Sequence, residues 1–222
     1  MTLCLVTDRR RLGRSLGASP DVLVECLLTQ IQGAVEAGID LVQLRETDLE
    51  AAELLKLATR ILTEVPKSRG RLVINDRLDV ALSAGAAGVH LRERSMSVDA
   101  VLKLAPAGFR VGRSVHDVKG ALAAGRADYL IAGTVLSTPS KSTVRLLGLE
   151  GLARIVRATD GQPVLGIGGL TGESVPALVA AGAAGLAAVG AFIPDAGQNL
   201  ATFVQTTVKK LRFGFDSAKG LS

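Results

Sequence analysis

Polar side chains follow several short apolar runs in this chain, and the most informative pair is Gln43 and Arg45. They alternate with Val42 and Leu44, so a β-strand here places both polar side chains on one face. A buried amide and guanidinium are costly unless an anionic group binds them. We therefore favour ligand binding by Gln43 and Arg45. An internal ion pair between Arg45 and Glu46 is the alternative.

A carboxylate at the end of another apolar run suggests a metal ion. Asn75 and Asp76 end this run, and Asp76 can bind Mg²⁺ through one carboxylate when water and a diphosphate supply the other ligands. The alternative is that this pair caps the following helix. Asn75 and Arg77 are candidates for binding substrate or phosphate, because both belong to the same polar strand end.

Two histidines are present, and His116 is the better candidate for chemistry. Gly112, Ser114 and His116 fall on one face of an expected strand, so the imidazole can face a ligand and Ser114 can bind it. An ordinary imidazole pKa near ~6.5 suits proton transfer. A histidine that only caps the next helix is the rival interpretation. His90, within an apolar strand, is expected to be structural.

Two glycine-containing segments can bind a phosphate group. Gly168 and Gly169 follow the apolar run 163–167, and Val189 with Gly190 repeats the pattern. Bare backbone N–H groups before a helix are a common phosphate site, and loops after the seventh and eighth strands of (β/α)8 barrels often have this role. Ordinary turn chemistry is the alternative.

A long polar segment, 134–147, lies between the expected sixth and seventh strands. Thr138, Ser140 and Lys141 within it are candidates for substrate or phosphate binding. The segment is expected to be either a lid over the site or a plain surface loop.

The elements that position these residues recur along the chain. Alanine- and glycine-rich helix ends are followed by a short turn and a buried strand, which predicts repeated βα units. Eight strands are expected, at 3–8, 39–45, 71–76, 88–91, 109–115, 128–133, 163–169 and 185–191. Eight strands alternating with helices favour a single (β/α)8 TIM barrel at 1–213, with a disordered tail at 214–222, although strand number alone does not exclude an open sheet.

Composition limits the classes of partner. The 222 residues include no tryptophan and 3% aromatics, so single-stranded nucleic acid binding by stacking is not expected. The net charge of +5 has its densest cluster at Arg9, Arg10, Arg11 and Arg14. The segment 9–20 is expected to be a flap over the site or an irregular surface loop, either attracting phosphorylated ligands or simply solvated. Without a signal peptide pattern or membrane span, a cytoplasmic location is expected.

Ordered motifs over nearly the whole chain resemble the thiamine phosphate synthase family. They are Leu5–Asp8, Val42–Glu46, Ile74–Arg77, Gly88–Leu91, Ala127–Tyr129, Thr138–Lys141, Leu147–Leu152 and Ile167–Gly169. The resemblance implies one barrel fold shared by two enzymes, namely the synthase and the TenI-like thiazole tautomerase. The synthase joins Mg²⁺-bound hydroxymethylpyrimidine diphosphate to a thiazole phosphate and releases pyrophosphate.

The resemblance to the synthase also implies roles for individual residues. One set matches its diphosphate and pyrimidine contacts: Gln43, Arg45, Asn75, Thr138, Ser140 and Lys141. Asp76 matches one magnesium ligand, and Gly169, Val189 and Gly190 match the thiazole phosphate site. Two positions depart from the pattern. Thr47 stands where the synthase has lysine, and Ser95 replaces the second magnesium carboxylate unless Glu93 reaches into its place.

The motif Gly112–His116 resembles that of the tautomerase, whose histidine is the proposed acid/base. These features favour a tautomerase that aromatises a thiazole carboxylate phosphate without a metal, with His116 as general acid/base and Gln43 and Arg45 binding the carboxylate or ring. The alternative is the Mg²⁺-dependent synthase. A third hypothesis is a non-catalytic sensor of a phosphorylated ligand. Barrels of this kind often dimerise, so a homo-oligomer is one expectation.

Overall fold

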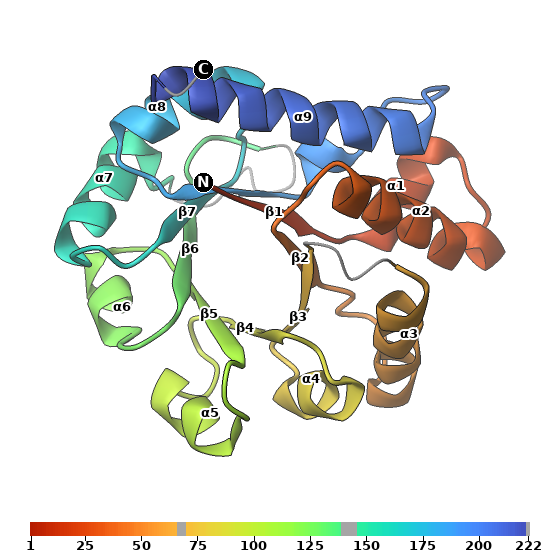
Figure 1. The fold of residues 1–222 in the computed structure, drawn as a ribbon, viewed down its shortest axis with the longest axis horizontal. Coiled ribbons are helices and arrows are strands. Elements are labelled where there is room, and N and C mark those ends of the chain that lie inside the picture. Colours follow the sequence, from red (N-terminus) through yellow and green to blue (C-terminus); the bar gives the residue numbers. More distant parts are fainter. Residues whose placement is uncertain (66–69, 139–145, 221–222) are drawn as a thin grey trace.

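The computed structural model describes residues 1–65, 70–138 and 146–220, in which eight parallel strands close into a barrel in sequence order (Figure 1). The strands are β1 (Thr2–Val6), β2 (Leu41–Leu44), β3 (Arg71–Asn75), β4 (Gly88–Leu91), β5 (Arg110–Val115), β6 (Tyr129–Gly133), β7 (Val164–Ile167) and β8 (Gly185–Ala188). The pairing of β1 with β8, in which Thr2 lies opposite Gly185, closes the ring. The predicted (β/α)8 barrel is confirmed.

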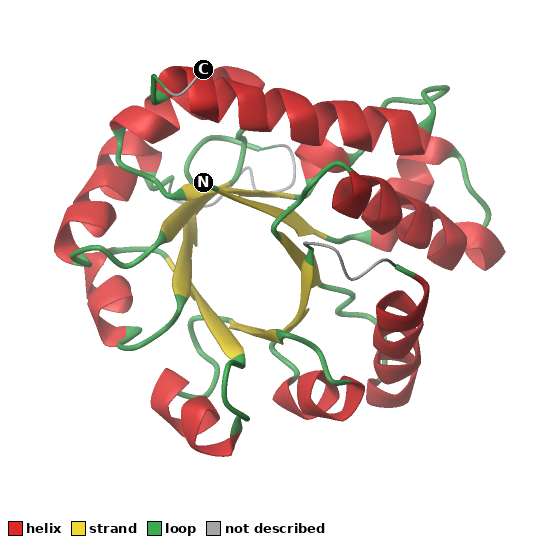
Figure 2. Cartoon of the chain, in the orientation of Figure 1, coloured by secondary structure: helices red, strands yellow, loops and turns green. Residues whose placement is uncertain are grey.

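Helices surround the strands on the outside of the barrel (Figure 2). They are α1 (Arg9–Leu16), α2 (Leu23–Glu36), α3 (Ala51–Glu64), α4 (Leu78–Ala84), α5 (Val98–Leu104), α6 (Val118–Ala123), α7 (Gly148–Ala158), α8 (Val175–Ala180) and α9 (Leu200–Ala218), with short 3₁₀ turns η1 (Pro20–Val22), η2 (Gly172–Ser174) and η3 (Gly190–Phe192). Strand, helix and strand follow one another, as parallel pairing requires.

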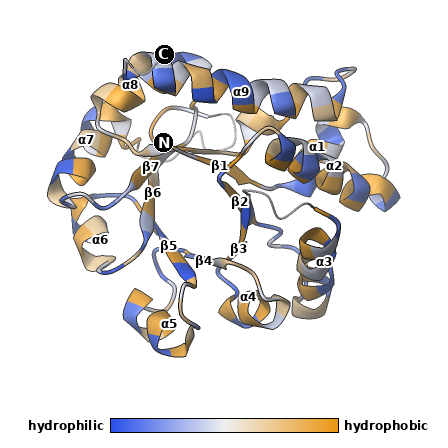
Figure 3. Cartoon of the chain, viewed as in Figure 1, coloured by the Kyte–Doolittle hydropathy of each residue, from blue (hydrophilic) through white to orange (hydrophobic). Residues whose placement is uncertain are grey.

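The apolar residues form two packed regions. A small cluster fills the barrel interior and includes Cys4, Val6 and Leu165, while a larger one lies between the strands and the outer helices. Figure 3 shows hydrophobic and hydrophilic residues alternating along outer helices such as α9, as expected for helices with one buried face. Both cysteines are free thiols. No helix in the described part of the chain combines the length and hydrophobicity needed to cross a bilayer.

The segment 9–20 is not the flap or irregular loop that its basic composition predicted. Residues 9–16 form α1, which begins at the N-cap Asp8, whose carboxylate accepts a hydrogen bond from the backbone N–H of Arg11 over 2.9 Å. It ends at Gly17, whose φ of 64° is the left-handed conformation that favours glycine. Leu12 is fully buried, so a narrow apolar stripe holds the helix to the barrel.

The C-terminal tail also differs from expectation. The last helix, α9, continues to Ala218, so residues 214–218 are helical and not disordered. Leu211 and Phe215 are one helical turn apart and both are buried, with exposures of 2% and 0%. Burial of this apolar pair stabilises the end of the helix. Of the long segment 134–147 after β6, residues 139–145 lie outside the described residues, and these include the predicted site residues Ser140 and Lys141.

Candidate active site

A cavity of about 1240 Å³ opens at the carboxyl ends of the strands. Five arginines and three carboxylates line it within the described part of the chain, so its charge favours an anionic ligand. Most of the predicted site residues meet here: Gln43, Arg45, Asn75, Asp76, Ser114, His116, Thr138, Gly168, Gly169, Val189 and Gly190. Arg77 is the exception among the described residues, because it lines a smaller neighbouring cavity and pairs with Asp79 at 2.5 Å.

The ends of β2 and β3 present amide groups to the cavity. The Gln43 side chain is the donor of the pair, and its Nε2 donates to Asn75 Oδ1 over 3.0 Å. Both side chains are at least nine-tenths buried. The bond fixes which way each amide faces, leaving Gln43 Oε1 and Asn75 Nδ2 to bind a flat heteroaromatic ring or another polar ligand.

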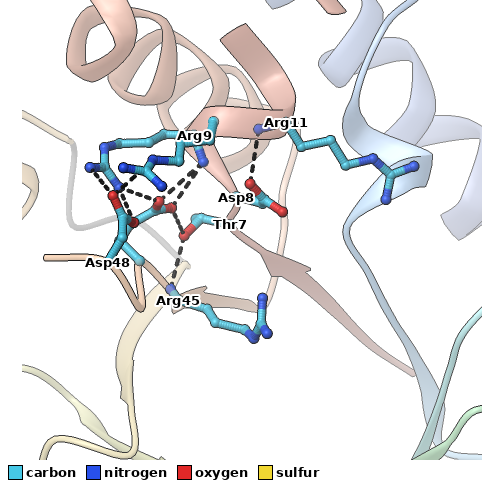
Figure 4. Close-up of polar contacts among 8 residues, drawn as sticks. Thr7, Asp8, Arg9, Arg11, Arg45 and Asp48 are labelled. Atoms are coloured by element: carbon cyan, nitrogen blue, oxygen red, sulfur yellow. Dashed lines mark hydrogen bonds and ion pairs between the residues drawn. The ribbon is translucent and has the colours of Figure 1, made fainter. Parts of the chain in front are cut away.

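Arg45 does not form the internal ion pair with Glu46. That carboxylate instead accepts hydrogen bonds from Thr7 Oγ1 at 2.6 Å and from Arg9 Nη1 at 2.9 Å. Burial raises the pKa of Glu46, against the opposing effect of these hydrogen bonds. Thr7 Oγ1 also accepts from the Arg45 backbone N–H at 2.9 Å, which fixes the start of the loop after β2. Figure 4 shows Arg45 extending away from this network.

Arg9 joins α1 to the loop after β2. Its guanidinium makes a two-bond contact with Asp48, each bond 2.7 Å long, in addition to its bond with Glu46. Arg11, two residues along the same helix, extends in another direction (Figure 4). The position that a Cβ would occupy on Gly190 lies 3.0 Å from Arg11 Nη2, so this guanidinium lies against the loop after β8. No carboxylate in the described residues forms an ion pair with Arg11.

The loops after β6 and β7 pack closely around two glycines. Gly168 and Gly169 have φ values of 102° and 64°, which favour glycine. A Cβ on Gly169 would lie 2.8 Å from the carbonyl oxygen of Leu136, so the two loops also leave no room for a side chain. The backbone N–H of Leu136 donates to the Gly168 carbonyl over 3.0 Å and holds the loops together.

A buried histidine forms the cavity wall on β4. His90 is 1% exposed, and its Nε2 lies 2.9 Å from Ser114 Oγ while Nδ1 lies 3.3 Å from the Tyr129 hydroxyl. Burial lowers the pKa of His90 to about 3, so the ring is neutral. A Cβ on Gly112 would lie 2.6 Å from His90 Nδ1. Glycine at that position therefore makes space for the histidine and tyrosine.

His116 lies at the mouth, on the carboxyl side of β5. Its side chain is 51% exposed, its Nδ1 contacts the carbonyl oxygen of Gly133, and its Nε2 lies 3.9 Å from the Glu93 carboxylate. The imidazole is accessible to a ligand in the cavity that it lines.

Asp76 is already occupied by protein groups. Arg92 Nε donates to its Oδ2 over 2.6 Å, Arg92 Nη2 contacts the same oxygen, and the Ser95 hydroxyl contacts Oδ1. Burial raises the pKa of Asp76, but the hydrogen bonds from Ser95 and Arg92 outweigh it and hold the pKa below its usual value. Asp76 is thus an ion-paired carboxylate.

Comparison with known proteins shows the family to which the chain belongs. The family model described as thiamine monophosphate synthase matches residues 5–192. The chain belongs to the thiamine monophosphate synthase family. A putative thiamine-phosphate synthase of Geobacter sulfurreducens is 39% identical over 197 residues, 87% of each chain. The thiamine-phosphate synthase of Pyrococcus abyssi is 34% identical over 193 residues, 86% of each chain.

Solved structures give the same result. Thiamine phosphate pyrophosphorylase from Pyrococcus furiosus superimposes with a TM-score of 0.78 and 29% identity, covering 98% of this chain and 96% of that one. A 3-hexulose-6-phosphate synthase, at 22% identity and a TM-score of 0.67, shares the fold alone.

Within the thiamine monophosphate synthase family, this chain was expected to depart at the second magnesium carboxylate. Ser95, at that position in the motif, contacts Asp76 directly through its hydroxyl. The Glu93 carboxylate faces His116 at the β5 end, so it does not take the place of the missing group. Arg92 binds Asp76 instead, and no local sequence pattern indicates this contact, because it joins two different loops.

Proposed function

We propose that this protein is a thiamine-phosphate synthase, which joins hydroxymethylpyrimidine diphosphate to a thiazole phosphate and releases pyrophosphate. From the sequence alone, the synthase was the alternative hypothesis and the tautomerase was the favoured one. The names of the relatives from Geobacter sulfurreducens and Pyrococcus abyssi support it, as does the name of the similar structure from Pyrococcus furiosus.

The observation that carries the proposal is one cavity with anion-binding groups on two sides. In the closed barrel, β3 and β4 lie across from β7 and β8. Arg45 and Arg92 are available for a diphosphate on the first side, and Arg11 with the Gly169 and Gly190 loops is available for a phosphate on the other. Two phosphorylated substrates can then meet over the barrel axis, where their reacting atoms are held close together.

In the reaction, the bond between the pyrimidine methylene carbon and the diphosphate oxygen breaks, and its electron pair leaves with pyrophosphate. The lone pair of the thiazole nitrogen forms the new C–N bond. The Gln43–Asn75 pair orients the pyrimidine ring. Arg45 stabilises negative charge on the departing diphosphate, because a guanidinium binds phosphate oxygens through two parallel hydrogen bonds. Ser114, which is hydrogen-bonded to the neutral His90, presents a fixed hydroxyl to the same cavity.

The Mg²⁺ that the family resemblance implies does not fit the donor set of this chain. Mg²⁺ usually takes only one or two protein carboxylates, and water and substrate phosphates supply its other oxygen ligands. Because residues 1–65, 70–138 and 146–220 contain no cluster of three or more His, Cys, Asp or Glu side chains placed to hold a metal ion, such a site would depend on open oxygens of Asp76. Asp76 is already bound by Arg92 and Ser95. We therefore derive no catalytic step through a metal.

Thiazole tautomerase is the second candidate, favoured by His116. Its imidazole lines the cavity at half exposure, beside the Glu93 carboxylate, as an acid/base group would. The two functions make opposite predictions for this residue. If the protein is a tautomerase, His116→Ala removes most of its tautomerase activity, because the imidazole transfers the proton. If it is a synthase, His116→Ala leaves the synthase activity nearly unchanged, because that reaction needs no proton transfer at this position.

The test is steady-state synthase activity of three variants, measured as thiamine phosphate formed. We expect Arg45→Gln to lower kcat/KM at least tenfold, because a charged contact to the leaving diphosphate is lost. His116→Ala is expected to stay within about threefold of wild type. Arg126→Gln is the control, since Arg126 is an exposed residue paired with Asp99. No thiamine phosphate formed by the wild type would contradict the proposal, and unchanged activity in Arg45→Gln would contradict the role given to Arg45.

A further inference from the structure

The ion pair between Arg92 and Asp76 lies where the diphosphate group is expected to bind. Asp76 has a φ of 65°, an uncommon conformation for a residue other than glycine. Its side chain is 16% exposed, and Arg92 covers it from the loop after β4. Asp76 and Arg92 line both the main cavity and the smaller neighbouring cavity of about 150 Å³. They therefore form part of the wall between the two.

The loop that carries Arg92 is held in place from β5. The Arg113 guanidinium donates to the carbonyl oxygens of Met96 and Glu93, each over 2.6 Å. The Arg92 backbone N–H donates to Ser95 Oγ over 3.1 Å, and the same hydroxyl contacts Asp76. The arginine is thus fixed at its backbone and at one edge of its guanidinium before any ligand binds.

Among the described residues, the other edge of the guanidinium makes no hydrogen bond or ion pair. A guanidinium has five N–H donors in a plane, and the contacts to Asp76 use only the Nε and Nη2 side. The Arg92 side chain is 68% exposed at the cavity mouth. Its remaining donors suit phosphate oxygens, which guanidinium groups bind through two parallel hydrogen bonds.

The same geometry argues against a cation at Asp76. A divalent ion bound there would have to displace Arg92 and the Ser95 hydroxyl. The ion would then lie next to the displaced Arg92 side chain, which is also positively charged. Across the cavity lining the arginines already exceed the carboxylates, so an anionic ligand meets positive charge without a metal.

We propose that Arg92 takes the place of the divalent cation. Oriented by Asp76 on one edge, it binds the diphosphate group directly through the other, so that the cavity binds a diphosphate in the absence of metal. This inference rests on the proposed function for the identity of the substrate, but its test is a binding measurement that requires no turnover.

The experiment is calorimetric titration of inorganic pyrophosphate into the 222-residue protein, once in EDTA and once in excess Mg²⁺, at about 0.15 M salt. We expect wild type to bind pyrophosphate in EDTA. Arg92→Gln is expected to bind it about 10- to 100-fold more weakly, the range for one charged hydrogen-bonding contact. Arg126→Gln removes the same charge outside the cavity and is expected to bind within twofold of wild type. Thermal unfolding of each variant checks that it is folded.

Two results would overturn the inference, namely pyrophosphate binding by wild type only when Mg²⁺ is present, or equal binding by Arg92→Gln and wild type in EDTA. Measuring synthase turnover of the same wild-type preparation distinguishes a failure of the Arg92 inference from a failure of the proposed synthase function. Turnover in Mg²⁺ with no pyrophosphate binding in EDTA contradicts the role of Arg92 and leaves the synthase standing. Pyrophosphate binding in EDTA without turnover in either condition contradicts the synthase and leaves the anion site.

Discussion

The neutral, buried His90 makes stability depend on pH in a way that can be calculated. Burial lowers the pKa of His90 from 6.5 to about 3 in the folded protein. Between these values the unfolded chain binds a proton that the folded chain does not, so stability falls as the pH falls. Integration of this difference gives a loss of about 2 kcal/mol in the free energy of unfolding between pH 7 and pH 5, from this one group.

Urea denaturation at pH 7 and pH 5 measures this loss. Because other groups also titrate, the informative quantity is the difference in this pH-dependent loss between wild type and His90→Gln. The glutamine of this variant cannot take up the proton but keeps an amide near Ser114. We expect the pH-dependent loss to be about 2 kcal/mol smaller in His90→Gln. His116→Gln, which removes the other histidine and leaves His90 in place, is the control. Equal pH-dependent losses in wild type and His90→Gln would refute the argument.

Two further substitutions test the packing and the charge of the cavity. Gly112→Ala forces a methyl group into the space of the buried Tyr129 ring. We expect the free energy of unfolding to fall by about 1–3 kcal/mol and the melting temperature to fall by several degrees. Gly172→Ala is the control, because its methyl group meets open space and leaves the melting temperature nearly unchanged. An equal melting temperature for both variants would contradict this packing. Arg11→Gln is expected to weaken thiazole phosphate binding, measured by calorimetry, about tenfold. Arg10→Gln, on the same helix, is expected to weaken it less than twofold. Equal weakening by both variants would indicate general charge attraction and contradict a specific contact with Arg11.

Much of the fold was predictable because the buried strands are continuous apolar runs that end in glycines or polar residues. The run Gly88–Leu91 matches β4 residue for residue, and the other strands differ from their predicted bounds by only a few residues. The helix α1 was missed because four of its eight residues are arginines. Only the buried Leu12 and half-buried Leu16 indicate its inner face, which is too short a pattern to stand out in a charged segment.

The sequence predicted which residues line the site, but it did not predict which of its charged side chains form ion pairs with one another. Side chains such as Gln43 and Ser114 lie at strand ends, and in a parallel barrel all strand ends meet at one mouth. Which charged groups pair depends on loop conformation. The contact of Arg92 with Asp76 joins loops 16 residues apart, and that of Arg9 with Glu46 spans 37 residues. No local sequence pattern encodes either pair, so the pairing of Asp76 with Arg92 became visible only in three dimensions.

The most direct test of the proposed function is a product assay on the purified protein with hydroxymethylpyrimidine diphosphate and thiazole phosphate. Thiamine phosphate and pyrophosphate are quantified in the same sample, with and without Mg²⁺. The synthase predicts both products in equal amounts, with neither formed when one substrate is left out. If both substrates bind but no thiamine phosphate forms in either condition, the protein is not a synthase, and the tautomerase reaction at His116 becomes the next assay.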